Sequence, residues 1–125
     1  MINLKEIRKI AIVGATTNVE KFGYIVLKDL KKKGFDVLPV TPRYEEIEGI
    51  KTYKSVEELP KDTELIVFIV PPQVGIEELK KAYNTGFRRF WFQPGAESTE
   101  IIEFSKSLTD AEVSFIKCIM VQTNW

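Results

Sequence analysis

The chain has 125 residues, of which 44% are hydrophobic and 29% are charged, as in an ordinary globular domain. This length fits one domain, residues 1–125, whose core needs no metal or disulfide. Its 18 basic side chains balance its 18 acidic ones, so net charge gives no support for a nucleic-acid or membrane partner. The chain has no histidine, which excludes a Ser-His-Asp triad, a histidine-ligated zinc site and phosphohistidine chemistry.

The apolar segments and the single cysteine indicate the cellular compartment. The longest apolar run, residues 65–72, is too short to cross a bilayer, and no charged-then-apolar secretion signal opens the chain. Cys118 cannot form an internal disulfide, so we expect a reducing, cytoplasmic setting. We expect Cys118 itself to be a small buried residue at the end of the last strand. No metal site is predicted.

The first third of the chain predicts a strand, a glycine turn, a helix and a second strand. Residues 9–13 are apolar and β-branched, which is typical of a strand buried on both faces. Gly14 ends this strand, and a short polar run leads to an amphipathic helix over residues 21–33. Residues 35–40 predict the second strand, in which Pro39 favours a bulge or irregular pairing.

The remainder of the chain continues the same alternation. A polar connection leads to a short helix that opens at Ser55, where a Ser-x-x-Glu capping box begins. Strands are then predicted at residues 64–70, 88–92 and 112–119, separated by helices at 73–84 and 98–108. This alternation predicts an α/β fold: a Rossmann-like, doubly wound three-layer sandwich around a mainly parallel five-stranded sheet, in the order 3-2-1-4-5.

Four loops follow the carboxyl ends of the predicted strands: residues 14–21, 41–43, 70–73 and 93–96. Ligands of doubly wound sheets bind beyond the carboxyl ends of the strands, near the point where the strand order reverses. We therefore expect these loops to converge on one site. The amide of Gln93, at a strand end beside that site, is a candidate to bond a ligand carbonyl.

The glycine turn indicates a phosphate, because it leads into the amino end of a helix. Gly14 begins a dinucleotide fingerprint, but Thr16 and Val19 occupy the places of its second and third glycines. The second strand ends at Arg43 without the carboxylate that would hold ribose hydroxyls. This disfavours NAD and favours NADP or a 3′-phosphorylated adenosine. Lys21 adds positive charge for a pyrophosphate.

Five short motifs, in order along almost the whole chain, resemble the small coenzyme-A-binding proteins, which are similar to the N-terminal domain of the succinyl-CoA synthetase α subunit. They are Val13-Gly14-Ala15-Thr16, Val40-Thr41-Pro42-Arg43, Val70-Pro71-Pro72, Phe92-Gln93-Pro94-Gly95 and Cys118-Ile119-Met120. The resemblance implies a Rossmann-like fold that holds CoA across the carboxyl edge of its sheet. The phosphorylated histidine and the later domain of the synthetase are missing from these residues.

The resemblance also implies a role for individual residues. It places the pyrophosphate against Gly14, Thr16, Thr17 and Asn18 with Lys21 nearby, adenine beside Pro42, the 3′-phosphate at Arg43, and pantetheine along Val70 and Pro71. Ala15, Thr41, Pro72 and Gln93 complete the set of expected cofactor contacts. Thr16 and Thr41 depart from the Ser and Asn that relatives more often carry, although both keep a hydrogen-bonding group.

Two other polar groups have simple structural explanations. The triplet Lys31 to Lys33 fits a solvated helix end that faces the helix dipole, rather than a nucleic-acid patch. Glu97 and Glu100 resemble an acid–base pair, but carboxylates in the first turn of a helix explain them more simply. No catalytic constellation is therefore predicted.

We expect a cytoplasmic protein that binds coenzyme A or an acyl-CoA and has no catalytic activity of its own. The alternative is a small NADP-dependent oxidoreductase, or the nucleotide-binding subunit of a larger enzyme. A third interpretation is a regulatory module that senses acyl-CoA. The fifth strand, at an edge of the predicted sheet, is a candidate surface for a homodimer, and an unknown protein partner stays open.

Overall fold

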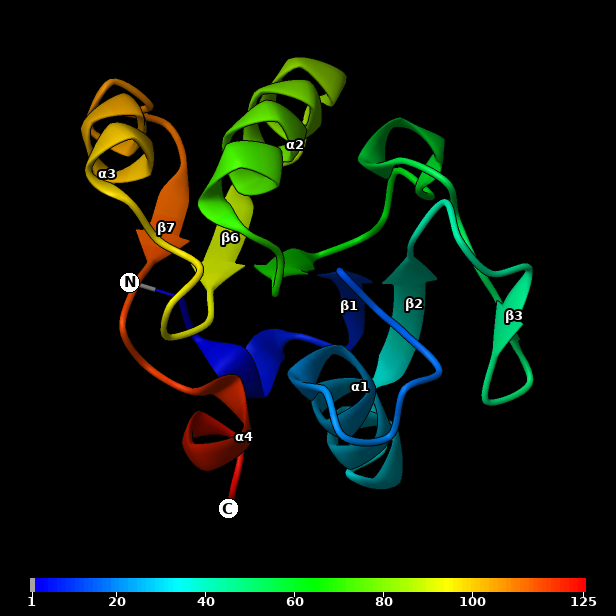
Figure 1. The fold of residues 1–125 in the computed structure, drawn as a ribbon. Helices are drawn as coiled ribbons and strands as arrows, with labels where there is room; N and C mark the ends of the chain where they lie inside the picture. Colours follow the sequence, from blue (N-terminus) through cyan, green and yellow to red (C-terminus); the bar gives the residue numbers. More distant parts are fainter. Residues whose placement is uncertain (1) are drawn as a thin grey trace.

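The computed structural model describes residues 2–125, which alternate strands and helices around one five-stranded sheet (Figure 1). The sheet consists of β1 (Lys9–Val13), β2 (Asp36–Val40), β5 (Leu65–Phe68), β6 (Arg89–Phe92) and β7 (Glu112–Ser114). These strands lie in the order β2-β1-β5-β6-β7, and each neighbouring pair is parallel. The predicted Rossmann-like α/β class is confirmed.

The predicted order 3-2-1-4-5 holds when the extended backbone at Tyr53, which bridges Val40 in parallel, is counted as the third strand. The stretch expected in that place, residues 64–70, instead forms β5 on the other side of β1. The outer edge of β2 is already occupied, because the Tyr53 N–H donates to Pro39 O at 2.9 Å and Tyr53 O accepts from the Thr41 N–H at 2.8 Å. The order of the strands along the chain therefore reverses between β1 and β5.

Helices cover both faces of the sheet and make three layers (Figure 1). On one face lie α1 (Phe22–Lys32) and the short α4 (Ile119–Gln122), and on the other lie α2 (Pro72–Thr85) and α3 (Thr99–Lys106). Successive side chains of a strand enter opposite cores, so Ile10 and Ile12 pack with α1 while Ala11 packs with α2. The helices thus pack on both faces of the sheet, and loops cover the ends of the strands.

Four short elements complete the fold: the 3-10 turns η1 (Leu4–Glu6) and η2 (Val56–Glu58), and the hairpin strands β3 (Glu46–Ile47) and β4 (Ile50–Lys51). The Ser55 hydroxyl accepts the Glu57 N–H at 3.3 Å, which caps η2 as the sequence predicts. The hairpin lies beside β2 at one side of the molecule (Figure 1).

The bulge predicted at Pro39 is wrong, because β1 and β2 pair in continuous register with Ile12 opposite Pro39. In a parallel pair, alternate residues turn their backbone groups toward the neighbouring strand. Val40 O accepts the Gly14 N–H, so the nitrogen of Pro39 faces outward, where no hydrogen bond to β1 is lost. Proline fits β2 without a break, because on this outer side β2 meets only the isolated bridge at Tyr53, which uses Pro39 O and not its nitrogen.

The last predicted strand is too long. β7 ends at Ser114, and Ile116 has a positive φ of 77°, which turns the backbone away from the extended region. The Trp91 indole N–H donates to Lys117 O at 2.9 Å and holds this turn against β6. Cys118 consequently is the N-cap of α4 and is only partly buried, so its expected place as a buried strand-end residue is also wrong.

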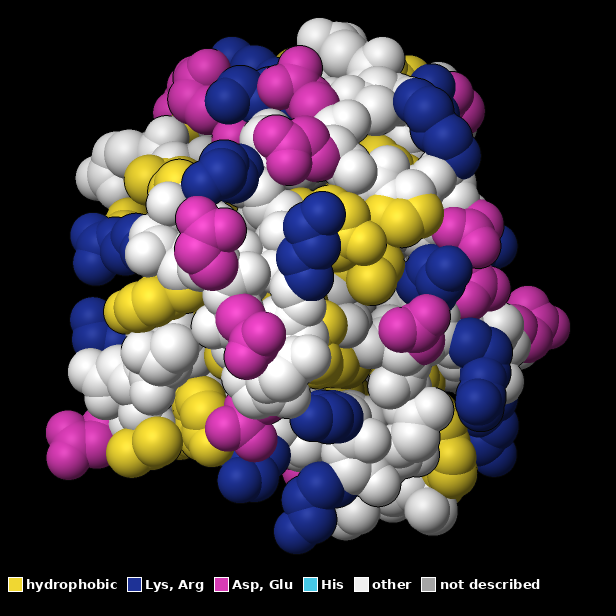
Figure 2. All heavy atoms as spheres, turned by 90° about the vertical axis from the view of Figure 1, so that its right-hand side faces the viewer, with side chains coloured by type: hydrophobic (Ala, Val, Ile, Leu, Met, Phe, Trp, Pro, Cys, Tyr) yellow, Lys and Arg dark blue, Asp and Glu magenta, His cyan; other side chains and the backbone are white. Residues whose placement is uncertain are grey.

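Two further observations concern the helices and the charges on one face of the molecule. No helix within residues 2–125 combines the length and apolarity needed to span a bilayer. On the face shown in Figure 2, basic and acidic side chains are interspersed, and neither sign forms a continuous field. This mixed surface, like the balanced composition, gives no support for a nucleic-acid partner.

Candidate ligand-binding site

A cavity of about 960 Å³ opens beyond the carboxyl ends of β1, β2 and β5. It lies at the reversal point of the sheet, where ligands of doubly wound folds bind. Nine of the thirteen predicted contacts line it: Gly14, Ala15, Thr16, Lys21, Thr41, Pro42, Arg43, Val70 and Pro71. The loops after β1, β2 and β5 therefore converge as the sequence predicts, whereas the fourth predicted loop, residues 93–96, does not line this cavity.

In the turn after β1, two glycines stand at positions where a Cβ atom would clash with neighbouring backbone. Gly14 has a φ of +101°, and a Cβ there would lie 2.3 Å from Ile69 O. Gly23, in the first turn of α1, approaches so closely that a Cβ would lie 2.0 Å from Gly14 O. The two glycines allow the amino end of α1 to pack directly against the end of β1.

The amino end of α1 is open to the cavity. Its N-cap, Lys21, has an extended backbone, and no side chain caps the first turn. Unpaired N–H groups and the helix dipole favour an anion at such a position. Lys21 also lines the cavity, so the N-cap residue itself brings a basic side chain to this part of the site.

Local hydrogen bonds shape the loop between Gly14 and α1. The Thr16 hydroxyl accepts the Asn18 N–H at 3.2 Å, and the Asn18 side-chain oxygen accepts the Glu20 N–H at 3.0 Å. Thr17 and Asn18 are exposed at the loop tip and do not line the cavity. Their direct contact with a ligand stays a prediction.

The loop after β2 presents a free guanidinium group. Arg43 is exposed and, among residues 2–125, has no ion-pair partner. The backbone N–H of Arg43 donates to the buried Thr41 hydroxyl at 3.2 Å. This hydrogen bond fixes the turn that carries the Arg43 side chain. The adjacent Pro42 is exposed at the cavity, where its ring offers an apolar surface.

Tyr44, which the sequence analysis did not single out, joins these two loops. Its hydroxyl lies 3.3 Å from the Thr16 hydroxyl, across 28 residues of sequence. Hydrogen bonding with Thr16, then with Thr17, and the charges of Arg43 and Lys21 lower the pKa of Tyr44. Tyr44 therefore links the loop after β1 to the loop that carries Arg43 at the wall of the cavity.

The cavity continues between α2 and the segment that follows Tyr53. Lys54 and Ser55 line one side, and Val74, Glu78 and Lys81 line the other. Glu78 and Lys81 form an ion pair at 3.1 Å. Val74, Glu78 and Lys81 share one helix face by their spacing, but only the fold brings that face to the residue 53–55 segment.

Two further predicted contacts, besides Thr17 and Asn18, lie outside this cavity. Pro72 begins α2 just beyond its wall. Gln93 is buried, its oxygen accepts the Ile119 N–H at 2.7 Å, and its amide nitrogen lies 3.4 Å from the Cys118 sulfur. The Gln93 amide thus caps the start of α4, which explains its position at the end of β6 without a ligand.

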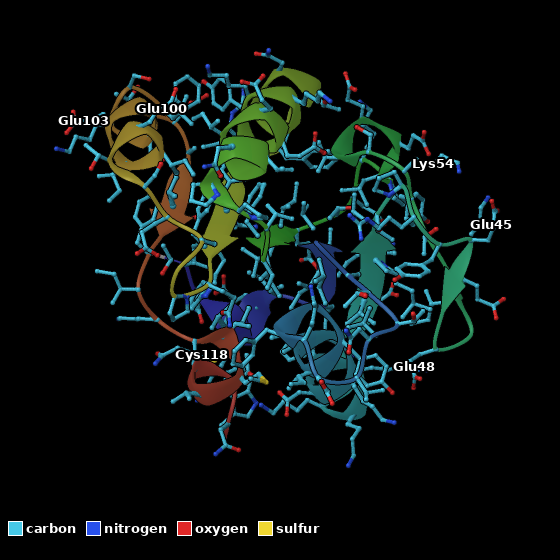
Figure 3. The ribbon with its side chains drawn as sticks, viewed as in Figure 1. Glu45, Glu48, Lys54, Glu100, Glu103 and Cys118 are labelled. Carbon is cyan, nitrogen blue, oxygen red and sulfur yellow. The ribbon has the colours of Figure 1, made fainter. Side chains whose placement is uncertain are left out.

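The glutamates considered as an acid–base pair also lie outside the cavity. The Glu97 carboxylate accepts the Gly95 N–H at 3.0 Å, a local loop contact. Figure 3 places Glu100 on α3, on the opposite side of the molecule from Lys54. Residues 2–125 contain no group of three or more ligating side chains that could hold a metal ion.

Two solved structures superpose on most of this chain, which in turn covers most of each of them. A conserved hypothetical protein from Pyrococcus furiosus is 58% identical and superposes with a TM-score of 0.90, covering 92% of this chain and 98% of that one. A hypothetical protein from Pyrococcus horikoshii OT3 is 33% identical with a TM-score of 0.88, covering 95% and 83%.

Curated relatives include parts of larger proteins. The acetate–CoA ligase (ADP-forming) II subunit alpha of Pyrococcus furiosus is 46% identical over 65 residues, which are 51% of this chain and only 14% of that subunit. The uncharacterized protein YneT of Bacillus subtilis is 27% identical over 105 residues, 82% of this chain and 76% of YneT. The family model described as "CoA binding domain" matches residues 8–124. The chain therefore belongs to the CoA-binding domain family.

Proposed function

We propose that the carboxyl-edge cavity binds coenzyme A or an acyl-CoA, and that this chain contributes binding rather than catalysis. One observation carries the proposal: an open helix N-terminus and an unpaired arginine face the same cavity. CoA carries two separated anionic groups, a pyrophosphate and a ribose 3′-phosphate, and therefore matches two separated positive positions. The naming of a curated relative as an acetate–CoA ligase subunit supports this ligand.

The residues present fit such a ligand. The close approach of Gly23 to Gly14 lets the backbone of the turn come near a pyrophosphate, as in other phosphate-binding turns. Lys21 would add charge there, and Arg43 would hold the 3′-phosphate. Pro42, Val70 and Pro71 supply the apolar lining that the uncharged parts of the ligand require.

The absence of catalysis is a separate part of the proposal. The cavity lining contains no cysteine or aspartate, and its carboxylates, Glu20 and Glu78, come from different segments, one in the turn before α1 and one within α2. A protein partner would then supply any chemistry, which agrees with the relatives that are named as subunits. A cytoplasmic location and a homodimer through β7, an edge strand of the sheet, are parts of the same proposal.

Calorimetric titration of the purified chain with CoA, dephospho-CoA, NADP and NAD tests the ligand. We expect binding in the order CoA above dephospho-CoA, and NAD weakest, because only CoA places a phosphate on the ribose 3′ oxygen while matching both positive positions. Tighter binding of NADP than of CoA would favour the oxidoreductase interpretation, since Arg43 also suits a ribose 2′-phosphate. No binding of CoA would overturn the proposal.

Arg43→Ala sharpens this test. Loss of a charge-assisted contact to the 3′-phosphate is expected to weaken CoA binding about tenfold and to leave dephospho-CoA binding unchanged. Arg8→Ala is the matched control, because Arg8 lies before β1 and outside the cavity. Equal weakening of CoA and dephospho-CoA by Arg43→Ala would contradict the assignment of the 3′-phosphate.

A further inference from the structure

The α2 wall of the cavity carries an ion pair that the phosphates of the ligand do not use. Glu78 and Lys81 lie one and nearly two turns after Val74 on the same helix and line the cavity with it. Opposite them is the segment at Lys54 and Ser55, which leads directly into η2, and α2 packs against η2. This end of the cavity is therefore a cleft with a helix on one side.

The covalent order of CoA determines which part of it reaches this cleft. The base is attached to the ribose, the ribose carries the 3′-phosphate, and pantetheine leaves from the far side of the pyrophosphate. With the pyrophosphate at α1 and the 3′-phosphate at Arg43, the base, which is a second branch of the same ribose, lies next to Arg43. The lining residues that the phosphates leave unused are Lys54 and Ser55 on one side and the α2 face on the other. Adenine is the part of the ligand that this cleft would receive.

Glu78 has unused hydrogen-bonding capacity in the wall of this cleft. Its side chain is only 15% exposed, and Lys81 is its single side-chain partner among residues 2–125. An ionised carboxylate has about four acceptor positions, so one ammonium group leaves acceptors free. The hydrogen bond and charge of Glu78 raise the pKa of Lys81, which stays protonated and able to donate.

The edge of adenine matches this pair. Its exocyclic amino group donates, and the ring nitrogen beside it accepts, so a carboxylate and an ammonium side by side offer the complementary groups. Val74 is 47% exposed at the cavity and supplies an apolar surface for the face of the base. Reading a base by its polar edge while apolar groups cover its face is a general mode of base recognition.

We propose that Glu78 determines the base specificity of the site by accepting a hydrogen bond from the adenine amino group, while Lys81 holds the Glu78 carboxylate and donates to the adjacent ring nitrogen. This inference rests on the proposed function, because it needs CoA in the cavity. It adds a residue contact on α2 that lies outside the loops from which the phosphates are bound.

The test compares CoA with 1,N6-etheno-CoA, whose base has lost both the amino donors and the adjacent ring acceptor. Wild-type protein is expected to bind CoA about tenfold more tightly than the etheno form, the scale of hydrogen bonds to charged groups. Glu78→Gln should weaken CoA binding and reduce that ratio to about twofold, since the charged acceptor is lost. Glu77→Gln is the matched control, because Glu77 is exposed on the same helix and outside the cavity.

The outcomes separate the two proposals. Failure of the wild type to bind either compound would refute CoA binding itself. Binding of CoA with the same CoA to etheno-CoA ratio in wild type and Glu78→Gln would refute the role of Glu78 alone. Thermal unfolding of each variant checks the fold, and Lys81→Gln supplies a second route, with a smaller expected fall in the same ratio. An unchanged ratio in both folded variants would assign Glu78 and Lys81 to an ordinary helix ion pair.

Discussion

A cavity lies at each end of the strands, but the charged side chains around the two cavities differ in whether they have partners within the protein. At the amino end, a hollow of about 500 Å³ is lined by charged residues that are paired. Arg88 donates to the Asp110 carboxylate at 2.9 Å and to Tyr83 O at 2.9 Å, and the Glu64 carboxylate accepts the N–H groups of Arg8 and Lys9 at 2.9 Å each. Most of the polar groups at this end have partners inside the protein.

At the carboxyl end, the positive groups have fewer partners. Within residues 2–125, neither Lys21 nor Arg43 forms an ion pair, and the Lys54 ammonium approaches Glu45 only to 3.9 Å, with both side chains exposed (Figure 3). Internal pairs stabilise the fold, whereas unpaired charges around a cavity are available to a ligand. The comparison therefore predicts that changes at the carboxyl end act on binding and changes at the amino end act on stability.

The largest effect is expected at Gly23, where the two properties coincide. Gly23→Ala would place a Cβ 2.0 Å from Gly14 O, and backbone rather than a flexible side chain must move. Overpacking of this kind costs about 3 kcal/mol, and the displaced turn should also abolish CoA binding. Chemical denaturation and calorimetric titration measure the two losses.

Gly75→Ala is the control for that prediction. A Cβ at Gly75, inside α2, would meet the side chains of Ile101, Phe92 and Val70 at ordinary distances of 3.6 to 3.7 Å. Alanine also suits a helix better than glycine, so Gly75→Ala should keep or raise the free energy of unfolding. Wild-type stability and CoA affinity in Gly23→Ala would show that the close approach to Gly14 is not required.

A smaller, pH-dependent effect is expected at the amino end. Hydrogen bonds from the Lys9 and Arg8 N–H groups lower the pKa of Glu64 below its usual value of 4.5. A carboxyl whose pKa is lowered by folding stabilises the fold above its unfolded pKa, and this contribution disappears as the pH falls through the folded pKa. Glu64→Gln should cost about 1 kcal/mol at pH 7, progressively less below pH 4.5, and leave CoA affinity unchanged.

Urea unfolding at pH 7 and pH 3 measures the difference between wild type and Glu64→Gln. Glu103→Gln is the control, because Glu103 pairs with Lys106 at 3.2 Å while both side chains are more than half exposed, and such pairs contribute little. A deficit for Glu64→Gln that is equally large at both pH values would show that the N–H contacts do not depend on the ionised carboxylate. Weakened CoA binding in Glu64→Gln would contradict the expectation that changes at the amino end of the sheet act on stability alone.

The sequence predicted the elements that depend on local patterns and the convergence that follows from topology. The apolar run before Gly14, the glycine that ends it and the capping serine Ser55 each appear where their residue types require them. The nine lining residues in the loops after β1, β2 and β5 follow from the alternation of strands and helices, because parallel strands bring their carboxyl ends to one edge.

The errors arose where a long-range contact decided the outcome. A strand was expected over residues 112–119, but the Trp91 indole N–H donates to Lys117 O, 26 residues later, and holds a turn there. Gln93 lies outside the cavity because its amide oxygen accepts the Ile119 N–H at that turn, and its contact with a ligand stays a prediction. Pro39 was expected to disturb its strand, but its missing donor faces the edge of the sheet. Glu78 and Tyr44 were missed because only the packed fold shows which polar groups on α2 and after β2 reach the cavity.

The smallest expected effect tests whether the loops of the carboxyl end are held ready for the ligand. Tyr44→Phe removes the contact between the Tyr44 and Thr16 hydroxyls, at 3.3 Å, while the ring keeps its packing against the core. This contact joins the turn after β1 to the loop that carries Arg43. Its loss should therefore leave the free energy of unfolding unchanged and weaken CoA binding about twofold to threefold by reducing preorganisation. Tyr24→Phe loses a comparable hydroxyl contact, to Glu48 at 2.9 Å, outside the cavity and should bind CoA as wild type does. Equal CoA affinities of Tyr44→Phe and Tyr24→Phe in titration would show that the two loops reach their binding geometry independently, each fixed by its own strand end.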